Sequence, residues 1–233
     1  MEMTPMQKDW NAKGEEDPYY WSVTSNKNWE TEDFYETGRR DVEKYVTPYL
    51  KNVSTEKMVA LDIGCATGRM TRHLKFGEVV GVDVSTTMIA KARKDNPELE
   101  FHVIDGLTLN PLQSNRFNFV FSYSSLNHSP RKMYLKSMFN EIYRVLKNGG
   151  TARIMVRGFP PNSLGRTLWW KSFDSFYLAV GIVRGVPVPY FRFFNTQYGV
   201  CLKTNQLEAM TNYFTKSNSQ LDANGGLWAV LEK

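Results

Sequence analysis

The sequence predicts an α/β fold: a doubly wound, mostly parallel sheet of seven strands that ends in an antiparallel hairpin. The first observation is a buried-strand pattern at residues 58–61, which runs into a glycine-bracketed turn at residues 64–68. The second is the alternation of short apolar runs with amphipathic segments over residues 57–157, which is typical of βαβ units. The third is a turn at Asn224-Gly225-Gly226 between a short segment near residues 219–222 and the apolar run 227–231, which predicts a hairpin.

The segment before the core, residues 1–56, is predicted to be an N-terminal arm with cap helices. Up to about residue 30 it shows no clean hydrophobic period, so we expect irregular chain there. Thr31 is a candidate N-cap for a short helix over residues 31–35 that Gly38 breaks. A second amphipathic helix is expected over residues 40–50.

The predicted cofactor-binding core, residues 57–157, alternates strands with helices. The chain from Arg69 onward is interpreted as a helix after the first turn, and Ser85 as the N-cap of the next helix. Pro130 is expected to open a long amphipathic helix that Asn148-Gly149-Gly150 ends. The remaining strands of the core are predicted at residues 78–83, 99–104, 117–122 and 152–156.

Beyond the core the pattern changes. Residues 158–203 are interpreted as a lid insertion, because they combine a dense set of aromatic residues with an amphipathic helical stretch and Gly/Pro breaks. Residues 204–233 are predicted to close the fold with a helix capped by Thr204 and a hairpin of strands near residues 219–222 and 227–231. The whole chain, residues 1–233, is therefore expected to form a single domain.

Composition and charge exclude several classes of protein. The net charge of +5 is dispersed without a long Lys/Arg block, which disfavours a nucleic-acid partner. The longest apolar stretch is too short to span a bilayer, and residues 1–5 lack the pattern of a signal peptide. The two cysteines, Cys65 and Cys201, do not suggest a disulfide framework. These features together predict a cytoplasmic protein with no membrane span.

The residues around the first turn predict a ligand that contains adenosine. Asp83 ends the second strand, 19 residues after Gly64, where an acid can accept hydrogen bonds from both ribose hydroxyls. The turn at residues 64–68 lacks the G-x-G-x-x-G pattern that places a dinucleotide's pyrophosphate at a helix N-terminus. It also lacks the Gly-Lys-Ser/Thr of a phosphate-binding P-loop.

Five stretches of this region, in order along the chain, carry a family resemblance. They are Asp62-Ile63-Gly64-Cys65-Ala66-Thr67-Gly68, Gly81-Val82-Asp83-Val84-Ser85, Val103-Ile104-Asp105-Gly106, Phe119-Val120-Phe121-Ser122 with Leu126-Asn127-His128, and Arg144-Val145-Leu146-Lys147-Asn148-Gly149-Gly150. Together they resemble the motifs of class I S-adenosylmethionine-dependent methyltransferases, over about residues 58–156 and the terminal hairpin. One departure is Ala66, where many members have glycine. The resemblance implies a Rossmann-like methyltransferase fold, S-adenosylmethionine as cofactor and S-adenosylhomocysteine as product.

The resemblance also implies which residues hold the cofactor. Asp62 would face the ammonium group of the methionine moiety, Asp83 the ribose and Asp105 the adenine amino group, while Met88 would pack on the adenine ring. The three acids could instead be capping or turn residues, and Met88 could be a core residue. The full expected set is Asp62, Gly64, Cys65, Ala66, Gly68, Arg69, Asp83, Val84, Met88, Asp105, Gly106, Leu107 and Ser122.

His128 is the candidate catalytic base. The implied reaction is an in-line transfer of the methyl group from the sulfonium to a nucleophile, and an O–H or N–H acceptor must lose its proton. His128 follows the fourth predicted strand, where the acceptor would bind. Its alternative role is to order the loop before Pro130. His73 and His102 are interpreted as structural, and no metal site is expected, because residues 122–130 offer only Asn127 and His128 as ligands.

The aromatic residues indicate where the acceptor binds. Most of them lie outside the core, in residues 1–50 and 158–198, and the carboxyl ends of the strands would lie beneath these two segments. They could form an auxiliary core or a lid over a flat or apolar small molecule. The candidate substrate-binding residues are Tyr20, Phe34, Tyr123, Trp169 and Phe173.

These patterns predict methyl transfer to a small-molecule acceptor, at oxygen in preference to nitrogen. The segment Ser122-Tyr123-Ser124-Ser125 lacks the Asn/Asp-Pro-Pro-aromatic turn that accompanies methylation of a nucleobase amine, and no cysteine is nearby for carbon-5 cytosine chemistry. The alternatives are an RNA or protein methyltransferase, and a binding module that holds S-adenosylmethionine without turnover. The sequence does not indicate an oligomeric state.

Overall fold

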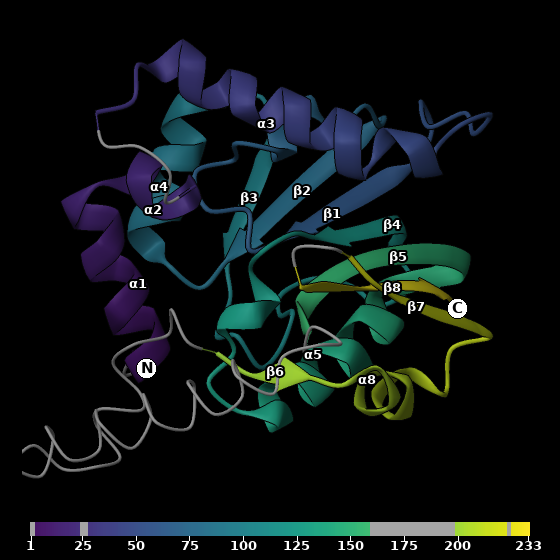
Figure 1. Cartoon of the computed structure of the whole chain (residues 1–233). Helices are drawn as coiled ribbons and strands as arrows, with labels where there is room; N and C mark the ends of the chain where they lie inside the picture. Colours follow the sequence, from purple (N-terminus) through teal and green to yellow (C-terminus); the bar gives the residue numbers. More distant parts are fainter. Residues whose placement is uncertain (1–2, 24–27, 159–198, 223–224) are drawn as a thin grey trace, which may run out of the picture.

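The computed structural model describes residues 3–23, 28–158, 199–222 and 225–233, and its centre is one mixed sheet (Figure 1). The sheet order is β3-β2-β1-β4-β5-β8-β7, with the short β6 paired to β5. Pairing is parallel from β3 to β5 and antiparallel for β5–β8 and β8–β7. The strands are β1 (Val59–Ile63), β2 (Glu78–Asp83), β3 (Glu100–Val103), β4 (Phe117–Ser122), β5 (Leu146–Gly158), β6 (Cys201–Leu202), β7 (Lys216–Leu221) and β8 (Gly226–Glu232).

This topology confirms the predicted doubly wound sheet and its terminal hairpin. The chain winds outward from β1 to β3 on one side, then returns to begin β4 on the other side of β1. In such a sheet the crevice for a ligand lies at the carboxyl ends of the two strands where the order reverses, here β1 and β4. The fold therefore places the turn after β1 and the loop after β4 beside one another.

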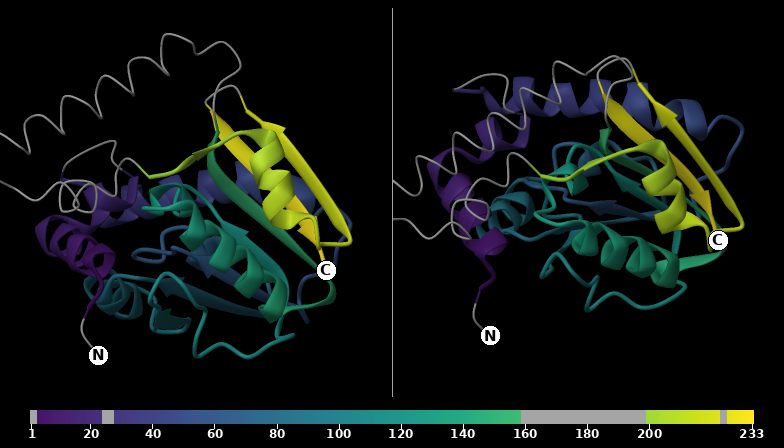
Figure 2. Two further views of the ribbon diagram at one scale, coloured as in Figure 1. Left: turned by 90° about the horizontal axis from the view of Figure 1, so that it is seen from below. Right: turned by 60° about the horizontal axis from the view of Figure 1, so that its bottom comes forward.

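Helices cover both faces of the sheet (Figures 1 and 2). One face packs against α3 through Val42 and Val46, and the other packs against α5 and α8 through residues such as Phe139 and Leu207. The helices are α1 (Pro5–Glu16), α2 (Pro18–Val23), α3 (Thr31–Tyr45), α4 (Thr86–Asp95), α5 (Lys132–Val145) and α8 (Thr204–Thr211), with 3-10 turns η1 (Thr47–Tyr49), η2 (Thr71–His73) and η3 (Leu126–His128).

The prediction of an irregular N-terminal arm is wrong, because α1 and α2 occupy most of it. Thr4 caps α1 by accepting a hydrogen bond from the backbone N–H of Gln7, and the Gln7 side chain accepts one from the Thr4 N–H in return. The buried residues of α1 are Asn11 and Lys13. Since α1 docks through polar side chains, it lacks the apolar stripe by which a helix is recognised in a sequence.

The predicted break at Gly38 is also wrong, because α3 runs through this residue. A Cβ atom at Gly38 would collide with the backbone carbonyl oxygen of Arg69. Glycine therefore allows α3 to approach the loop after β1, and this close approach outweighs the helix propensity that glycine lacks.

We expect Gly38→Ala to lower the free energy of unfolding by about 2 kcal/mol. Alanine is a better helix former than glycine by about 1 kcal/mol, but the backbone oxygen of Arg69 cannot move aside as a flexible side chain could. Urea unfolding at constant m-value measures the change. A gain in stability would mean that helix propensity decides and that the close approach does not.

Two smaller boundaries differ from prediction. The chain after Arg69 forms only η2 rather than a full helix, and α5 ends at Val145, before Asn148-Gly149-Gly150. This glycine pair lies within β5, where the Gly149 N–H donates to Lys233 O and the Lys233 N–H donates to Gly150 O. The segment thus pairs with the C-terminal residue instead of capping a helix. The predicted helix and aromatic stretch of the lid fall in residues 159–198, outside the described residues.

Candidate functional site

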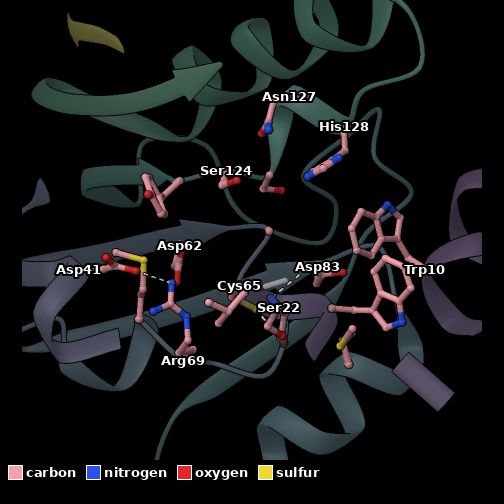
Figure 3. A pocket seen from close by; sticks show the side chains of 18 of the residues that line it. Trp10, Ser22, Asp41, Asp62, Cys65, Arg69, Asp83, Ser124, Asn127 and His128 are labelled. Carbon is pink, nitrogen blue, oxygen red and sulfur yellow. Dashed lines mark hydrogen bonds and ion pairs between the residues drawn. The ribbon is translucent and has the colours of Figure 1, made fainter. Parts of the chain in front are cut away.

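A cavity of about 390 Å³ opens at the carboxyl ends of β1, β2 and β4 (Figure 3). Its base is the turn after β1, from Gly64 to Arg69, and the loop after β4 forms a second wall. Helices α1 and α2 contribute Trp10 and Trp21, and α3 contributes Asp41. The volume lies in the range of small-molecule binding sites.

The turn after β1 is fixed by backbone hydrogen bonds. The N–H groups of Gly64 and Cys65 both donate to Val82 O, at 2.7 and 3.0 Å, so the turn is tied to the end of β2. Gly64 has a φ of 74°, and a Cβ there would collide with the Ser125 side chain. Glycine is therefore required both by the backbone conformation and by the close approach of the loop after β4.

Asp83 ends β2 and points into the cavity with 9% of its surface exposed (Figure 3). One carboxylate oxygen accepts a hydrogen bond from the Ala66 N–H at 3.0 Å, and the other accepts one from the Ser85 N–H at 2.9 Å. Burial raises the pKa of Asp83, while these backbone donors lower it. Each oxygen keeps a second lone pair, so the carboxylate can accept two further hydrogen bonds from a ligand.

Asp62 lies on the other side of the glycine turn and is 4% exposed. It accepts a hydrogen bond from the Thr71 hydroxyl at 2.7 Å. Burial raises its pKa to about 6, against the opposing effects of Thr71 and the nearby Arg69. The Arg69 guanidinium forms an ion pair with Asp41 at 2.7 Å. This end of the cavity thus presents carboxylates and one guanidinium, a set that complements an amino-acid zwitterion.

If Asp62 faces a ligand ammonium group, as the sequence predicts, ligand affinity is expected to rise about tenfold between pH 5 and pH 7, because that contact requires the carboxylate and the pKa of Asp62 is about 6. The folding linkage has the opposite sign. The folded-state pKa lies above the ordinary value of 3.8, so Asp62 contributes to stability mainly below pH 4, and this contribution is lost as the pH rises through 6. Calorimetric titration with S-adenosylhomocysteine across this range measures the affinity. Retention of the same rise near pH 6 in Asp62→Asn would assign it to another group.

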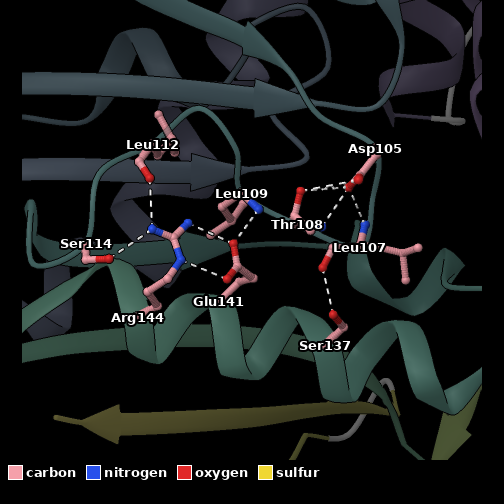
Figure 4. Close-up of polar contacts among 9 residues, drawn as sticks. All are labelled: Asp105, Leu107, Thr108, Leu109, Leu112, Ser114, Ser137, Glu141 and Arg144. Carbon is pink, nitrogen blue, oxygen red and sulfur yellow. Dashed lines mark hydrogen bonds and ion pairs between the residues drawn. The ribbon is translucent and has the colours of Figure 1, made fainter. Parts of the chain in front are cut away.

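The loop after β3 is held by α5 (Figure 4). Asp105 accepts hydrogen bonds from the N–H groups of Leu107 and Thr108, at 2.8 and 2.6 Å, which makes it a turn-capping acid. Ser137 and Glu141 of α5 bind the backbone of the same loop at Leu107 O and at the Leu109 N–H. In the described part of the chain, the Asp105 oxygen Oδ2 is contacted only by the Thr108 hydroxyl, at 3.2 Å.

The loop after β4 brings the candidate base into the cavity. The His128 ring packs edge-on against Trp10, with 5.2 Å between ring centroids. The adjacent Asn127 is 5% exposed, and its side-chain oxygen has no hydrogen-bond partner among the described residues. Tyr123 stacks on Tyr45 at 4.6 Å, and burial raises its pKa. A buried acceptor atom without a partner is costly, so the Asn127 side-chain oxygen calls for a hydrogen-bond donor, such as a water molecule or a ligand group.

The structure brings most of the sequence-predicted site residues together. The larger cavity is lined by Asp62, Gly64, Cys65, Ala66, Arg69, Asp83, Met88, Tyr123 and His128. A second cavity of about 40 Å³ shares its Gly64, Asp83 and His128 walls and adds Val84, Gly106 and Met6. The roles assigned to these residues stay predictions.

Other predicted residues line neither of these two cavities within the described chain: Gly68, Asp105, Leu107, Ser122, Tyr20 and Phe34. The Ser122 hydroxyl donates to Ile63 O inside the sheet. Phe34 is fully buried and stacks on Tyr19 at 4.3 Å, which places it in a core between α2 and α3 instead of in the cavity. Trp169 and Phe173 lie outside the described residues.

Sequence reasoning missed the residues that come from the N-terminal helices and the end of β5, and two serines of the loop after β4. They include Trp10, Trp21, Asp41, Ser124, Ser125 and Arg157. The aromatic density of the first 50 residues was the one available signal for Trp10 and Trp21. The sequence around Asp41 gives no signal of a binding site, because its ion-pair partner Arg69 belongs to a different element.

The described residues contain neither a membrane-spanning helix nor a metal-holding cluster. Across residues 3–23, 28–158, 199–222 and 225–233, no helix has the length and apolar character needed to cross a membrane. Within the same ranges, no cluster of three or more His, Cys, Asp or Glu side chains could hold a metal ion.

Comparisons with known proteins agree with the fold described above. Residues 61–154 match a family model described as a methyltransferase domain. The chain is similar to phosphoethanolamine N-methyltransferase 2 of Caenorhabditis elegans, with 31% identity over 106 residues that represent 42% of this chain and 23% of that protein. This chain spans less than half the length of the curated relatives that it matches.

Solved structures show the same fold. The PH0226 protein of Pyrococcus horikoshii OT3 superposes with a TM-score of 0.60 at 19% identity, covering 92% of this chain and 97% of that one. The phosphoethanolamine N-methyltransferase 2 of Haemonchus contortus, solved with phosphomonomethylethanolamine and S-adenosylhomocysteine, superposes with a TM-score of 0.54 at 23% identity over 76% of this chain and 38% of that one. The sheet and the helices that flank it are thus a shared fold.

Proposed function

We propose that this chain, which carries a class I S-adenosylmethionine-dependent methyltransferase domain, transfers a methyl group to a small-molecule acceptor, as do the relatives named for phosphoethanolamine. As the sequence predicts, we expect the acceptor atom to be oxygen in preference to nitrogen. The cofactor of this family is S-adenosylmethionine, and the family model covers the elements that line the cavity from β1 to β5. The polar groups around the loop after β4 support a small-molecule acceptor.

The residues of the cavity fit the cofactor. Gly64 lets the loop after β4 approach the turn, since a Cβ there would collide with the Ser125 side chain, and the buried carboxyl groups of Asp62 and Asp83 line the same cavity. In our proposal Asp83 holds the ribose hydroxyls, Asp62 accepts from the ammonium group, and Arg69 faces the carboxylate of the methionine moiety. When bound, the cofactor supplies a methyl group on a positively charged sulfur.

The chain's own residues then bind and orient the acceptor. Trp10, Trp21 and Tyr123 line the cavity and offer flat apolar surfaces to an acceptor. His128 accepts the proton that the acceptor atom releases. Positioning of the acceptor along the line of transfer supplies most of the remaining rate.

The single observation that carries this proposal is the pair Asn127 and His128. They are adjacent in η3, both line the cavity that contains Asp62 and Asp83, and the Asn127 side-chain oxygen is buried without a partner in the described chain. An acceptor with an O–H or N–H group satisfies that oxygen, whereas an acceptor without a donor leaves it unpaired. The relatives named for phosphoethanolamine support a small acceptor.

The test uses S-adenosylmethionine labelled with tritium in the methyl group, incubated with the protein and with separate small-molecule, RNA and protein fractions of a cell extract. We expect label in the small-molecule fraction, absent from a reaction with heat-inactivated protein. Repeating the reaction with a carbon-13 methyl group then identifies the methylated atom by its chemical shift. Label in RNA or protein would overturn the small-molecule acceptor, and cofactor binding without label in any fraction would favour a binding module.

A further inference from the structure

Asn11 of α1 binds the N-terminus of α4, next to Asp83 of the candidate cofactor site. An α-helix begins with N–H groups that lack partners within the helix. At α4 the Met88 N–H donates to the Ser85 hydroxyl, and the Ser85 N–H donates to the Asp83 carboxylate. The Thr86 N–H donates at 2.8 Å to the side-chain oxygen of Asn11, which lies 75 residues earlier in the sequence.

Asn11 is held at the centre of this arrangement. It is 8% exposed, and its side-chain oxygen also accepts from the Ser85 hydroxyl at 3.0 Å and approaches the Thr87 N–H at 3.5 Å. The Thr87 hydroxyl donates back to Asn11 O at 3.0 Å. Asn11 therefore bonds the same three-residue segment, 85–87, whose first N–H fixes the Asp83 carboxylate.

The contact between α1 and α4 is close as well as polar. A Cβ at Gly14, one turn after Asn11, would collide with the Thr87 hydroxyl and lie 3.1 Å from the Thr87 Cβ. Glycine in a helix interior is less favourable than alanine. Its presence at Gly14 is explained by the approach of α1 to α4.

The position of α1 in turn sets one wall of the cavity. Trp10 precedes Asn11, lines the cavity and contacts the His128 ring. Lys13 lies over the Trp10 and Trp21 rings, with its ammonium nitrogen 4.5 and 5.2 Å from their centroids. Met6 lines the smaller cavity beside Gly106. One helix thus contacts both the residues that support Asp83 and the residue proposed as the base.

We propose that Asn11 is a positioning residue that couples the docking of α1 to cofactor binding. A cofactor on Asp83 holds the 83–87 segment in the conformation that Asn11 binds, and Asn11 holds α1 over the cofactor. Each event therefore favours the other, and loss of the Asn11 acceptor weakens both. The proposal rests on S-adenosylmethionine as the cofactor and is independent of the acceptor.

The experiment measures S-adenosylhomocysteine affinity and dissociation rate for the full chain without acceptor. Asn11→Ala is expected to weaken affinity about tenfold, mainly through faster dissociation. Asn11→Asp keeps the acceptor oxygen and places a charge that a helix N-terminus favours, so it should stay within about threefold of the wild type. Asn205→Ala, at an exposed position of α8, is the matched control and should bind normally.

Gly14→Ala tests the docking by a separate route. It improves the helix propensity of α1 but places a methyl group against Thr87, so we expect faster dissociation of S-adenosylhomocysteine despite a better helix. Hydrogen exchange over residues 5–16 should slow on addition of S-adenosylhomocysteine in the wild type, and slow much less in Asn11→Ala and Gly14→Ala.

Three results would overturn the proposal. They are wild-type affinity and dissociation in Asn11→Ala, equal weakening by Asn11→Ala and Asn11→Asp, or exchange over residues 5–16 that does not respond to the ligand. A role in folding alone would lower the melting temperature and leave S-adenosylhomocysteine binding unchanged well below it. Because no acceptor is present, these outcomes are separate from those of the methyl-transfer experiment.

Discussion

Replacement of His128 by alanine is expected to lower the rate of methyl transfer about a hundredfold while leaving S-adenosylhomocysteine affinity nearly unchanged. His128 lies on η3 and lines the cavity opposite Asp83, where it can accept a proton from the acceptor atom. Removal of a general base acts on the chemical step, whereas in our proposal the cofactor's ribose and methionine moieties bind at Asp83 and Asp62. The loss should therefore appear in kcat.

The His128 ring also packs against Trp10, and a second variant separates this packing from proton transfer. His128→Phe keeps an aromatic ring for the edge-on contact and cannot accept a proton. We expect it to be as slow as His128→Ala. His102→Ala is the control, because the His102 ring faces Glu100 at the far edge of β3. If His128→Phe keeps most of the wild-type rate, His128 orders the loop after β4 and the contact with Trp10, and it is not the base.

The elements that the sequence predicts well are those whose signals are local. Strands β2 and β4 match their predicted ranges, and Ser85 caps α4 as expected, because a run of apolar residues or a capping hydroxyl is recognised within a few positions. The terminal hairpin is predicted for the same reason. The motif order along these elements is what makes the family resemblance specific.

The elements that were missed depend on contacts between distant parts of the chain. Helix α1 is fixed by Asn11 on α4, so its docking face is polar and carries no period in hydrophobicity. Gly38 predicts a helix break from the sequence alone, but in the structure it allows the Arg69 carbonyl group to lie close to α3. Local propensity is a weak guide when a tertiary contact of this kind decides the conformation.

The residues of the candidate site also fall into two groups, those that local signals place and those that distant contacts place. Asp62 and Asp83 could be placed from their positions at strand ends, because parallel strands bring those ends to one edge of the sheet. Asp41 and Trp10 could not, since only the packing of α1 and α3 brings them there. Asp105 also ends a strand region, yet its carboxylate caps the following turn, so a sequence position alone does not distinguish a ligand-binding acid from a turn acid.

Asp83→Asn is expected to weaken S-adenosylhomocysteine binding by about 3 kcal/mol, or about 150-fold. Both carboxylate oxygens accept a backbone N–H, from Ala66 and from Ser85, and the Asp83 side chain lines the cavity. An amide replaces one oxygen with an NH₂ group, which opposes one of these backbone donors and cannot accept from a ribose hydroxyl. The variant thus loses a charge-assisted hydrogen bond and weakens the second.

Asp105→Asn provides the comparison that makes this result specific to the ribose. Asparagine keeps an oxygen for the Leu107 and Thr108 N–H groups, so the turn is preserved. Loss of one hydrogen bond from the adenine amino group would cost about 1 kcal/mol, or about fivefold in affinity. Calorimetry with S-adenosylhomocysteine on both variants should therefore show the effect at Asp83 exceeding that at Asp105 by more than tenfold. Affinity in Asp83→Asn within threefold of the wild type would remove Asp83 from the ribose, and the cofactor's orientation in the cavity would have to be assigned anew.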